Sequence, residues 1–121
     1  MSVDAYISRL ITLFSKHSDL EMISFTDHNQ ISTEVYKKFL SKNTSVKLLI
    51  GLEADLYIEE GESGDNYKHI IFYFDDEKFD LNTQAEKINS FLKNNHIPTL
   101  ANFLNFLITK IKVSNCADSV V

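Results

Sequence analysis

The chain has 121 residues, a formal net charge of −5, 44% hydrophobic residues and 24% charged residues. These values are ordinary for a soluble globular protein with one domain and one modest core. The negative charge argues against a broad nucleic-acid-binding face, which needs clustered Lys and Arg. A nucleotide or a nucleic-acid end held through metal ions remains compatible with it.

Cysteine content and hydropathy bear on location. The single cysteine, Cys116, excludes an intramolecular disulfide and favours a reducing compartment. Residues 1–20 lack the basic start and apolar run of a signal peptide. A membrane helix needs about twenty apolar residues in a row, and no stretch of the chain approaches that. We therefore expect a cytoplasmic protein without membrane contact.

The first third of the chain predicts helix, strand and helix. Apolar residues at helical spacing over Ser2 to Lys16 predict a helix with Ser2 as its N-cap. Met22 to Thr26 has the pattern of a short buried strand, and it ends in the polar run Asp27-His28-Asn29-Gln30. A second helix is predicted to begin near Ser32, a residue that suits an N-cap.

Strands dominate the middle of the chain. Val46 to Ile50 predicts a second buried strand, followed by Gly51. Strict alternation from Leu52 onward predicts a separate, longer strand with Glu53 and Asp55 on one face. Tyr67 to Phe74 predicts a further apolar strand that carries His69 near its centre.

The last third predicts two helices and a tail. Asn82 is expected to cap a helix over residues 83–93, and Thr99 to cap one that continues to Ile111. Residues 114–121 show no period and are expected to form a disordered tail. Strands that alternate with helices favour an α/β fold with a mainly parallel sheet under helical cover. We assign residues 1–113 to this single, partial domain.

Three polar features follow or interrupt these strands. They are Thr26-Asp27-His28-Asn29, Gly51-Leu52-Glu53, and His69. Ligands and catalytic groups of α/β folds gather at strand ends. Imidazole and carboxylate form a ligand set for Zn, Mn or Fe, and paired ions can clamp a phosphate ester during hydrolysis. An Asp beside a ligating His can hold the ring in place.

Each feature also has an ordinary structural explanation. Asp27-His28-Asn29 could be only a turn, because Asp and Asn bond to nearby backbone. Glu53 could face solvent on an alternating strand, and His69 could be a hydrogen-bonded core residue. Asp55 shares the face of Glu53 and is the one extra carboxylate of interest. His17 and His96 lie at helix ends, where a cationic residue is common.

In order and spacing, the three features resemble the polymerase and histidinol phosphatase (PHP) family. The strings ISFTDHNQIS, LLIGLEADL and KHIIFYF look most like the PHP domains fused to AAA-like or SMC-like ATPases. The resemblance covers residues 2–74.

The resemblance implies a distorted (β/α)7 barrel with two or three metal ions at its mouth, and a phosphate ester as substrate. In this chain His28, Glu53 and His69 match metal-ligand positions of the family. Asp27 matches the acidic residue before the ligating His, and we assign it to contact that His rather than the metal. No catalytic residue is assigned beyond these.

The chain also departs from the family pattern. No His-x-His precedes His17, and after His69 the only histidine is His96, outside the family's Asp-x-His context. We therefore expect a fragment of a barrel that binds one divalent ion (Zn, Mn or Fe) or none and is weakly active or inactive alone. An incomplete barrel exposes strand edges, which predicts self-association or a partner that completes the barrel. The alternatives are a non-catalytic binding module and an unrelated small α/β domain.

Overall fold

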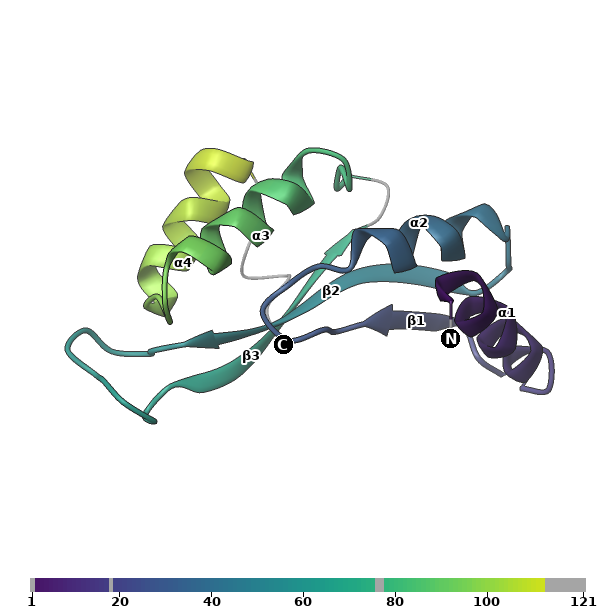
Figure 1. The fold of residues 1–121 in the computed structure, drawn as a ribbon, viewed down its shortest axis with the longest axis horizontal. Coiled ribbons are helices and arrows are strands. Elements are labelled where there is room, and N and C mark those ends of the chain that lie inside the picture. The colour runs from purple at the N-terminus through teal and green to yellow at the C-terminus, as the bar shows by residue number, and fades with distance from the viewer. Residues whose placement is uncertain (1, 18, 76–77, 113–121) are drawn as a thin grey trace.

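The computed structural model describes residues 2–17, 19–75 and 78–112 of the chain (Figure 1). The predicted tail at 114–121 and Cys116 lie outside these residues. The elements, in chain order, are α1 (Val3–Phe14), β1 (Met22–Phe25), α2 (Thr33–Ser41), β2 (Lys47–Leu56), β3 (Lys68–Asp75), α3 (Gln84–Asn94), α4 (Leu100–Phe106) and the π-helical turn η1 (Leu107–Ile111).

The three strands form one mixed sheet in the order β1-β2-β3. β1 pairs with β2 in parallel, and β2 pairs with β3 in antiparallel orientation. The expected α/β class is therefore observed, but the sheet is not mainly parallel. The reason lies in the connections. α2 links β1 to β2, whereas residues 57–67 link β2 to β3 without a helix. A parallel return needs a crossover of about a dozen residues or more, usually helical.

β2 joins two segments that the sequence pattern separated. Val46–Ile50 and the alternating stretch from Leu52 were predicted as two strands, but Lys47–Leu56 runs as one. Gly51 lies in the middle of that strand and is buried there, rather than ending it. As a result, one continuous strand, β2, pairs with β1 on one side and with β3 on the other.

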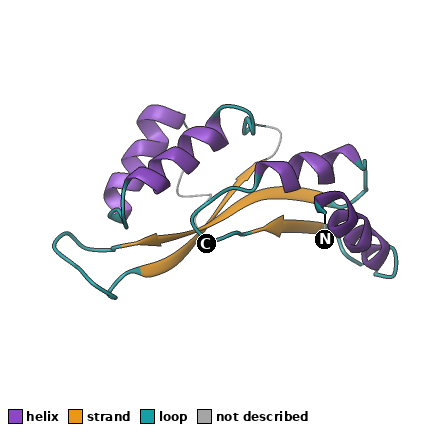
Figure 2. Ribbon diagram, viewed as in Figure 1, coloured by secondary structure: helices purple, strands orange, loops and turns teal. Residues whose placement is uncertain are grey.

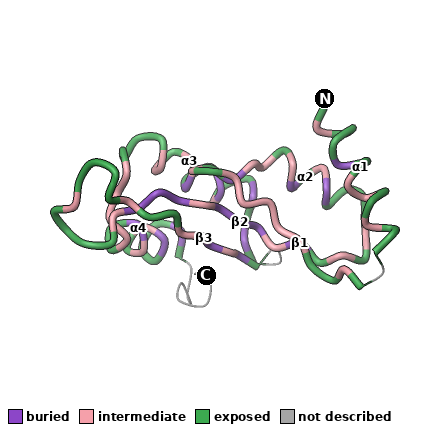
Figure 3. The backbone as a smooth tube through the Cα atoms, turned by 90° about the horizontal axis from the view of Figure 1, so that it is seen from below, coloured by how far each residue is buried: buried purple, intermediate pink, exposed green. Residues whose placement is uncertain are grey.

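The helices cover one face of the sheet (Figures 1 and 2). α2, α3 and α4 lie on this side, and α1 packs beside α2 through Phe14 and Phe39, whose ring centroids are 6.2 Å apart. Alternate residues of β2 and β3 turn toward the helices and are buried, and Figure 3 shows buried stretches along β2 separated by intermediate positions. These buried strand residues are Leu48, Ile50, Leu52, Ala54, Leu56, Phe72 and Phe74.

The opposite side of the sheet, called here the open face, carries the remaining alternate residues. Most of them are half-buried or exposed, because the described helices pack on the other side. Its residues on the three strands are Met22, Ser24, Lys47, Leu49, Gly51, Glu53, Asp55, His69, Ile71, Tyr73 and Asp75.

Helix caps agree in part with the sequence. Ser2 Oγ accepts from the Ala5 amide, and Thr99 Oγ1 accepts from the Asn102 amide, so both predicted N-caps are confirmed. Ser32 occupies the N-cap of α2, but its hydroxyl donates to Asp27 instead of capping. Thr83, not Asn82, occupies the N-cap of α3. Within the described ranges, no helix combines the length and the apolar character that a bilayer crossing requires.

On the open face, Gly51 lies beside the side chains of Ser24 and Thr26 from the neighbouring segment. A Cβ added there would lie 2.3 Å from Ser24 Oγ and 2.8 Å from Thr26 Cγ2. Neither distance allows a carbon atom unless the Ser24 and Thr26 side chains move, so the close approach favours glycine.

We expect Gly51→Ala to lower the free energy of unfolding by about 1–3 kcal/mol through overpacking. Removing Ser24 Oγ relieves the shorter contact, so the cost of Gly51→Ala should be smaller in a Ser24→Ala background. Urea denaturation of the two single variants and the double variant measures this coupling. Strictly additive costs would show that the two positions do not collide.

Candidate metal centre

The chain returns to the edge of β2 shortly after β1 ends. His28 forms an isolated parallel bridge with Glu53. The Glu53 amide donates to the Asp27 carbonyl at 3.0 Å, and the Asn29 amide donates to the Glu53 carbonyl at 2.6 Å. The offset between the strands is the same as in the β1–β2 ladder, so His28 and Glu53 point to the open face together.

β3 brings the third element to the same place. Its antiparallel register sets His69 opposite Asp55, and Ile71 opposite Glu53. Because side chains alternate along a strand, Glu53 and Asp55 share a face, and the residue paired with Asp55 shares it too. Four titratable side chains from three segments therefore converge on one side of the sheet.

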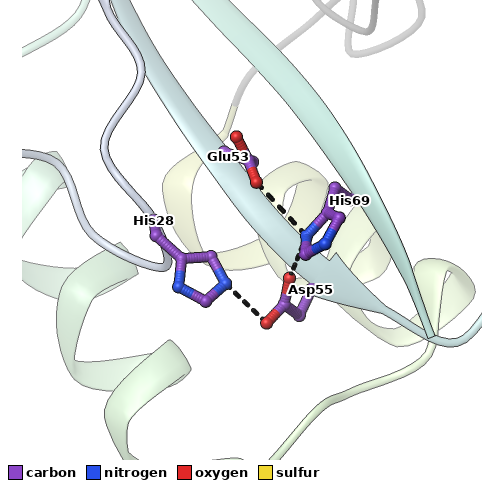
Figure 4. Close-up of side chains that lie close together, drawn as sticks. All are labelled: His28, Glu53, Asp55 and His69. Atoms are coloured by element: carbon purple, nitrogen blue, oxygen red, sulfur yellow. Dashed lines mark hydrogen bonds and ion pairs between the residues drawn. The ribbon is translucent and has the colours of Figure 1, made fainter. Parts of the chain in front are cut away.

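The resulting cluster consists of His28, Glu53, Asp55 and His69 (Figure 4). Asp55 is its centre: Oδ2 lies 2.6 Å from His28 Nε2, and Oδ1 lies 2.6 Å from His69 Nδ1. His69 Nδ1 is also 3.2 Å from Glu53 Oε1. One ligand atom from each residue can be chosen so that all four lie within 4.8 Å of one another.

Exposure differs sharply within the cluster. Asp55 is 6% exposed and is the one buried charged residue among those that the structure describes. The two imidazoles cover it and are themselves 58% exposed. A buried carboxylate needs hydrogen-bonding or cationic partners, and here two ring nitrogens fill that need. The exposed sides of both rings remain open to solvent and to an incoming molecule.

Asn29 supports the centre of the cluster. Its backbone has a φ of 57°, a left-handed conformation that Asn tolerates better than most residues. Its side-chain Oδ1 accepts from the Asp55 amide at 2.9 Å, and its Nδ2 donates to Asp55 Oδ2 at 3.4 Å. Sequence reasoning treated Asn29 as a turn residue and missed this role.

Asp27 does not lie with the cluster. Alternation turns its side chain to the helical side of the sheet, where the carboxylate accepts a hydrogen bond from Ser32 at the start of α2. The expected contact with the ligating His28 is made by Asp55 instead. The carbonyl of Asp27 still contributes, because it accepts from Glu53 and fixes the bridge. His17 and His96 are exposed and lie outside the cluster.

The donor set suits a divalent transition ion. Two imidazoles and two carboxylates are ligands for Zn, Mn and Fe. Bond lengths of about 2.0–2.2 Å place the ligand atoms of one tetrahedral ion about 3–4 Å apart. The observed spacing, from 2.6 Å up to 4.8 Å, brackets that value. The residues present therefore fit one ion, held after small side-chain movements.

Comparisons with known proteins add no relative. The chain matches no protein-family model, no curated protein and no solved structure. The resemblance to the PHP family accordingly rests on the three motifs alone.

The Asp55 carboxylate also stabilises the fold, and we expect Asp55→Ala to lower the free energy of unfolding by about 1–3 kcal/mol. The loss comes from charge-assisted hydrogen bonds to two rings and one amide. Chemical denaturation measures it, and Asp65→Ala, a change at an exposed loop carboxylate, is the control with an expected change below about 0.5 kcal/mol. Equal stabilities of the two variants would contradict the central role of Asp55.

Proposed function

We propose that the cluster on the open face is a metal-dependent phosphoesterase centre of the PHP type. The observation that carries the proposal is the convergence of His28, Glu53, Asp55 and His69 from three segments onto one point. The three residues that match the family's ligand positions are all members of it. Asp55 is a fourth member that the resemblance does not supply, and an ion held by three of the four side chains would keep a coordination position for water or substrate.

The negative charge of the chain and of the cluster explains why a phosphate-binding site here would need a bound cation. The chain is negative overall, and the cluster contains two carboxylates. A phosphate ester would be repelled from such a face unless a bound cation reversed the local charge. When bound, a divalent ion supplies Lewis-acid polarisation of a phosphoryl oxygen and lowers the pKa of a bound water. The chain's own residues hold the ligands in place and leave the outer side of the site accessible.

The substrate class we propose is a phosphate ester, with a nucleotide or a nucleic-acid end as candidates. A single four-ligand cluster supports one ion rather than a clamped pair, so hydrolysis by the chain alone is expected to be slow. The cytoplasm remains the proposed location.

The sheet would then be a part of a (β/α)7 barrel. β1, α2 and β2 form one strand–helix–strand unit with the helix on the outer side, and the open face would line the barrel interior. The antiparallel β3 departs from a simple repeat of that unit.

A non-catalytic binding module is the second candidate. It is favoured by the open face itself, where Met22 is 48% exposed and Leu49, Ile71 and Tyr73 are only half-buried. β1 also lies at the edge of the sheet, with β2 as its partner strand. Unpaired edges and apolar faces recruit other chains.

Metal binding is the first test. We expect Zn²⁺ or Mn²⁺ to raise the melting temperature, because an ion at 100 times its Kd stabilises the folded state by about 2.7 kcal/mol. His28→Ala and His69→Ala should remove the shift, whereas His96→Ala, at an exposed position outside the cluster, should keep it. A shift that persists in the His28→Ala/His69→Ala double variant would place metal binding elsewhere.

Hydrolysis is the second test. With p-nitrophenyl phosphate and bis-p-nitrophenyl phosphate, we expect slow turnover that requires Mn²⁺, Zn²⁺ or Fe²⁺ and falls about tenfold or more in Glu53→Gln. His96→Ala should retain the wild-type rate. Metal binding without turnover of either ester under any of the three ions would favour the binding module.

Self-association follows from the open face and from the β1 edge. Sedimentation velocity should show a species larger than 13.9 kDa, in an amount that rises with protein concentration. Met22→Lys, at an exposed position of the open face on the edge strand, should shift the chain toward the monomer by adding a charge there. A monomer at all concentrations, with sharp cooperative melting, would contradict this expectation.

A further inference from the structure

The β1–β2 ladder is interrupted immediately before the metal centre. Its regular pairs run from Met22–Lys47 to Phe25–Ile50, and backbone pairing resumes where the Glu53 amide donates to the Asp27 carbonyl. Gly51 and Phe25 each lie two residues before this pair, and in a regular parallel ladder the Gly51 amide would donate to the Phe25 carbonyl. In the structure a side chain stands between these two groups.

That side chain is Tyr36 of α2. The Gly51 amide donates to the Tyr36 hydroxyl at 2.7 Å, and the hydroxyl in turn donates to the Phe25 carbonyl. The Phe25 amide also donates to the same oxygen, at 3.1 Å. A tyrosine hydroxyl has one proton to donate and two lone pairs to accept with, so this arrangement uses its full capacity.

Tyr36 is held firmly in this place. Its side chain is fully buried, and its ring packs edge-on against Phe25 with centroids 5.4 Å apart. Burial raises the pKa of the Tyr36 hydroxyl above its usual value, which keeps the proton needed for the bond to Phe25. The hydroxyl therefore replaces one ladder hydrogen bond with a bridge of two.

The bridge lies close to the ligands along both strands. Gly51 is two residues before Glu53 on β2, and Phe25 is three residues before His28 on the other segment. A hydroxyl between two strands holds them further apart at that level than a direct N–H···O bond would. The distance between the His28 ring and Asp55 depends on this separation, because His28 reaches the cluster from the β1 side and Asp55 from β2.

We propose that Tyr36 is a positioning residue for the metal centre, whose hydroxyl sets the spacing of the two strands and thereby the place of His28 relative to Glu53 and Asp55. The inference rests on the proposed function in that it takes the cluster to bind a divalent ion. Tyr36 itself touches neither the ion nor the substrate in this scheme.

The test compares Tyr36→Phe with Phe39→Leu in the full chain. Both changes alter a buried aromatic side chain of α2 that contacts the Phe25 ring, but only the first removes the hydroxyl bridge. Three readouts are used: the Kd for Zn²⁺ by competition with a chelating dye, the visible absorption of bound Co²⁺, and amide hydrogen exchange at Asn29 and Glu53.

We expect the Kd of Tyr36→Phe for Zn²⁺ to rise about tenfold or more, the range for groups that orient metal ligands. Its Co²⁺ spectrum should change, and the Asn29 and Glu53 amides should exchange faster. Phe39→Leu should melt at a lower temperature but keep the wild-type spectrum, a Kd within about twofold of wild type, and slow exchange at both amides.

Several results would overturn the inference. Equal weakening of Zn²⁺ binding in both variants would show a general effect of stability. Unchanged Kd and unchanged exchange in Tyr36→Phe would show that the hydroxyl positions nothing. If Tyr36→Phe unfolds, the measurements are repeated in trimethylamine N-oxide, which favours the compact state. Failure to fold there, while Phe39→Leu folds, would assign the hydroxyl to the fold alone and also overturn the inference.

Amide hydrogen exchange does not depend on a bound metal, so it tests this inference separately from the proposed function. A wild-type chain that binds none of the ions would end the phosphoesterase proposal. Exchange at Asn29 and Glu53 would still decide the role of Tyr36, because faster exchange in Tyr36→Phe alone supports positioning and equal exchange in the two variants refutes it.

Discussion

Hydrogen bonding along one edge of β2 is the constraint on which the rest of the structure depends. Every buried backbone N–H and C=O group needs a hydrogen-bond partner. The odd-numbered residues of β2 direct their N–H and C=O groups toward the side where β1 lies. β1 is shorter than β2 and cannot pair with all of these backbone groups, so other groups of the chain form the remaining hydrogen bonds. The Tyr36 hydroxyl accepts from the Gly51 amide, and the backbone on either side of His28 pairs with Glu53. Further along, the Asn29 side chain accepts from the Asp55 amide. Just past the end of β2, the Tyr57 amide donates to the Pro98 carbonyl. The candidate site is built from these substitutes.

Asp55 links this backbone pairing to the side chains of the candidate site. Its amide is bonded by Asn29, its position opposite His69 follows from the β3 register, and its two carboxylate oxygens each contact an imidazole nitrogen. The two rings supply hydrogen-bond partners to a carboxylate that is nearly excluded from water. A divalent ion would meet the same need with stronger attraction, which is why a cluster that stabilises the fold can also be a binding site.

The two faces of the sheet separate the apolar core from the candidate site. Leu52, Ala54 and their buried neighbours form the core with the helices, while Glu53 and Asp55, one residue along, form the cluster. A shift of register by one residue would exchange the two sets, so the core itself holds the cluster on the open face. Because the described helices pack on the other side, the two imidazoles of the cluster stay exposed to solvent.

The sequence by itself determined the α/β class, most helix and strand positions, and the shared face of Glu53 and Asp55, because these follow from local periodicity and capping. His28, Glu53 and His69 were found from motif order, and the structure brings them together. Only the tertiary structure decided the antiparallel direction of β3, the continuity of β2 through Gly51, the turning of Asp27 toward α2, and the central place of Asp55. These depend on pairing between segments distant in sequence and on which backbone groups remain unpaired, and neither quantity can be read from a residue's neighbours along the chain.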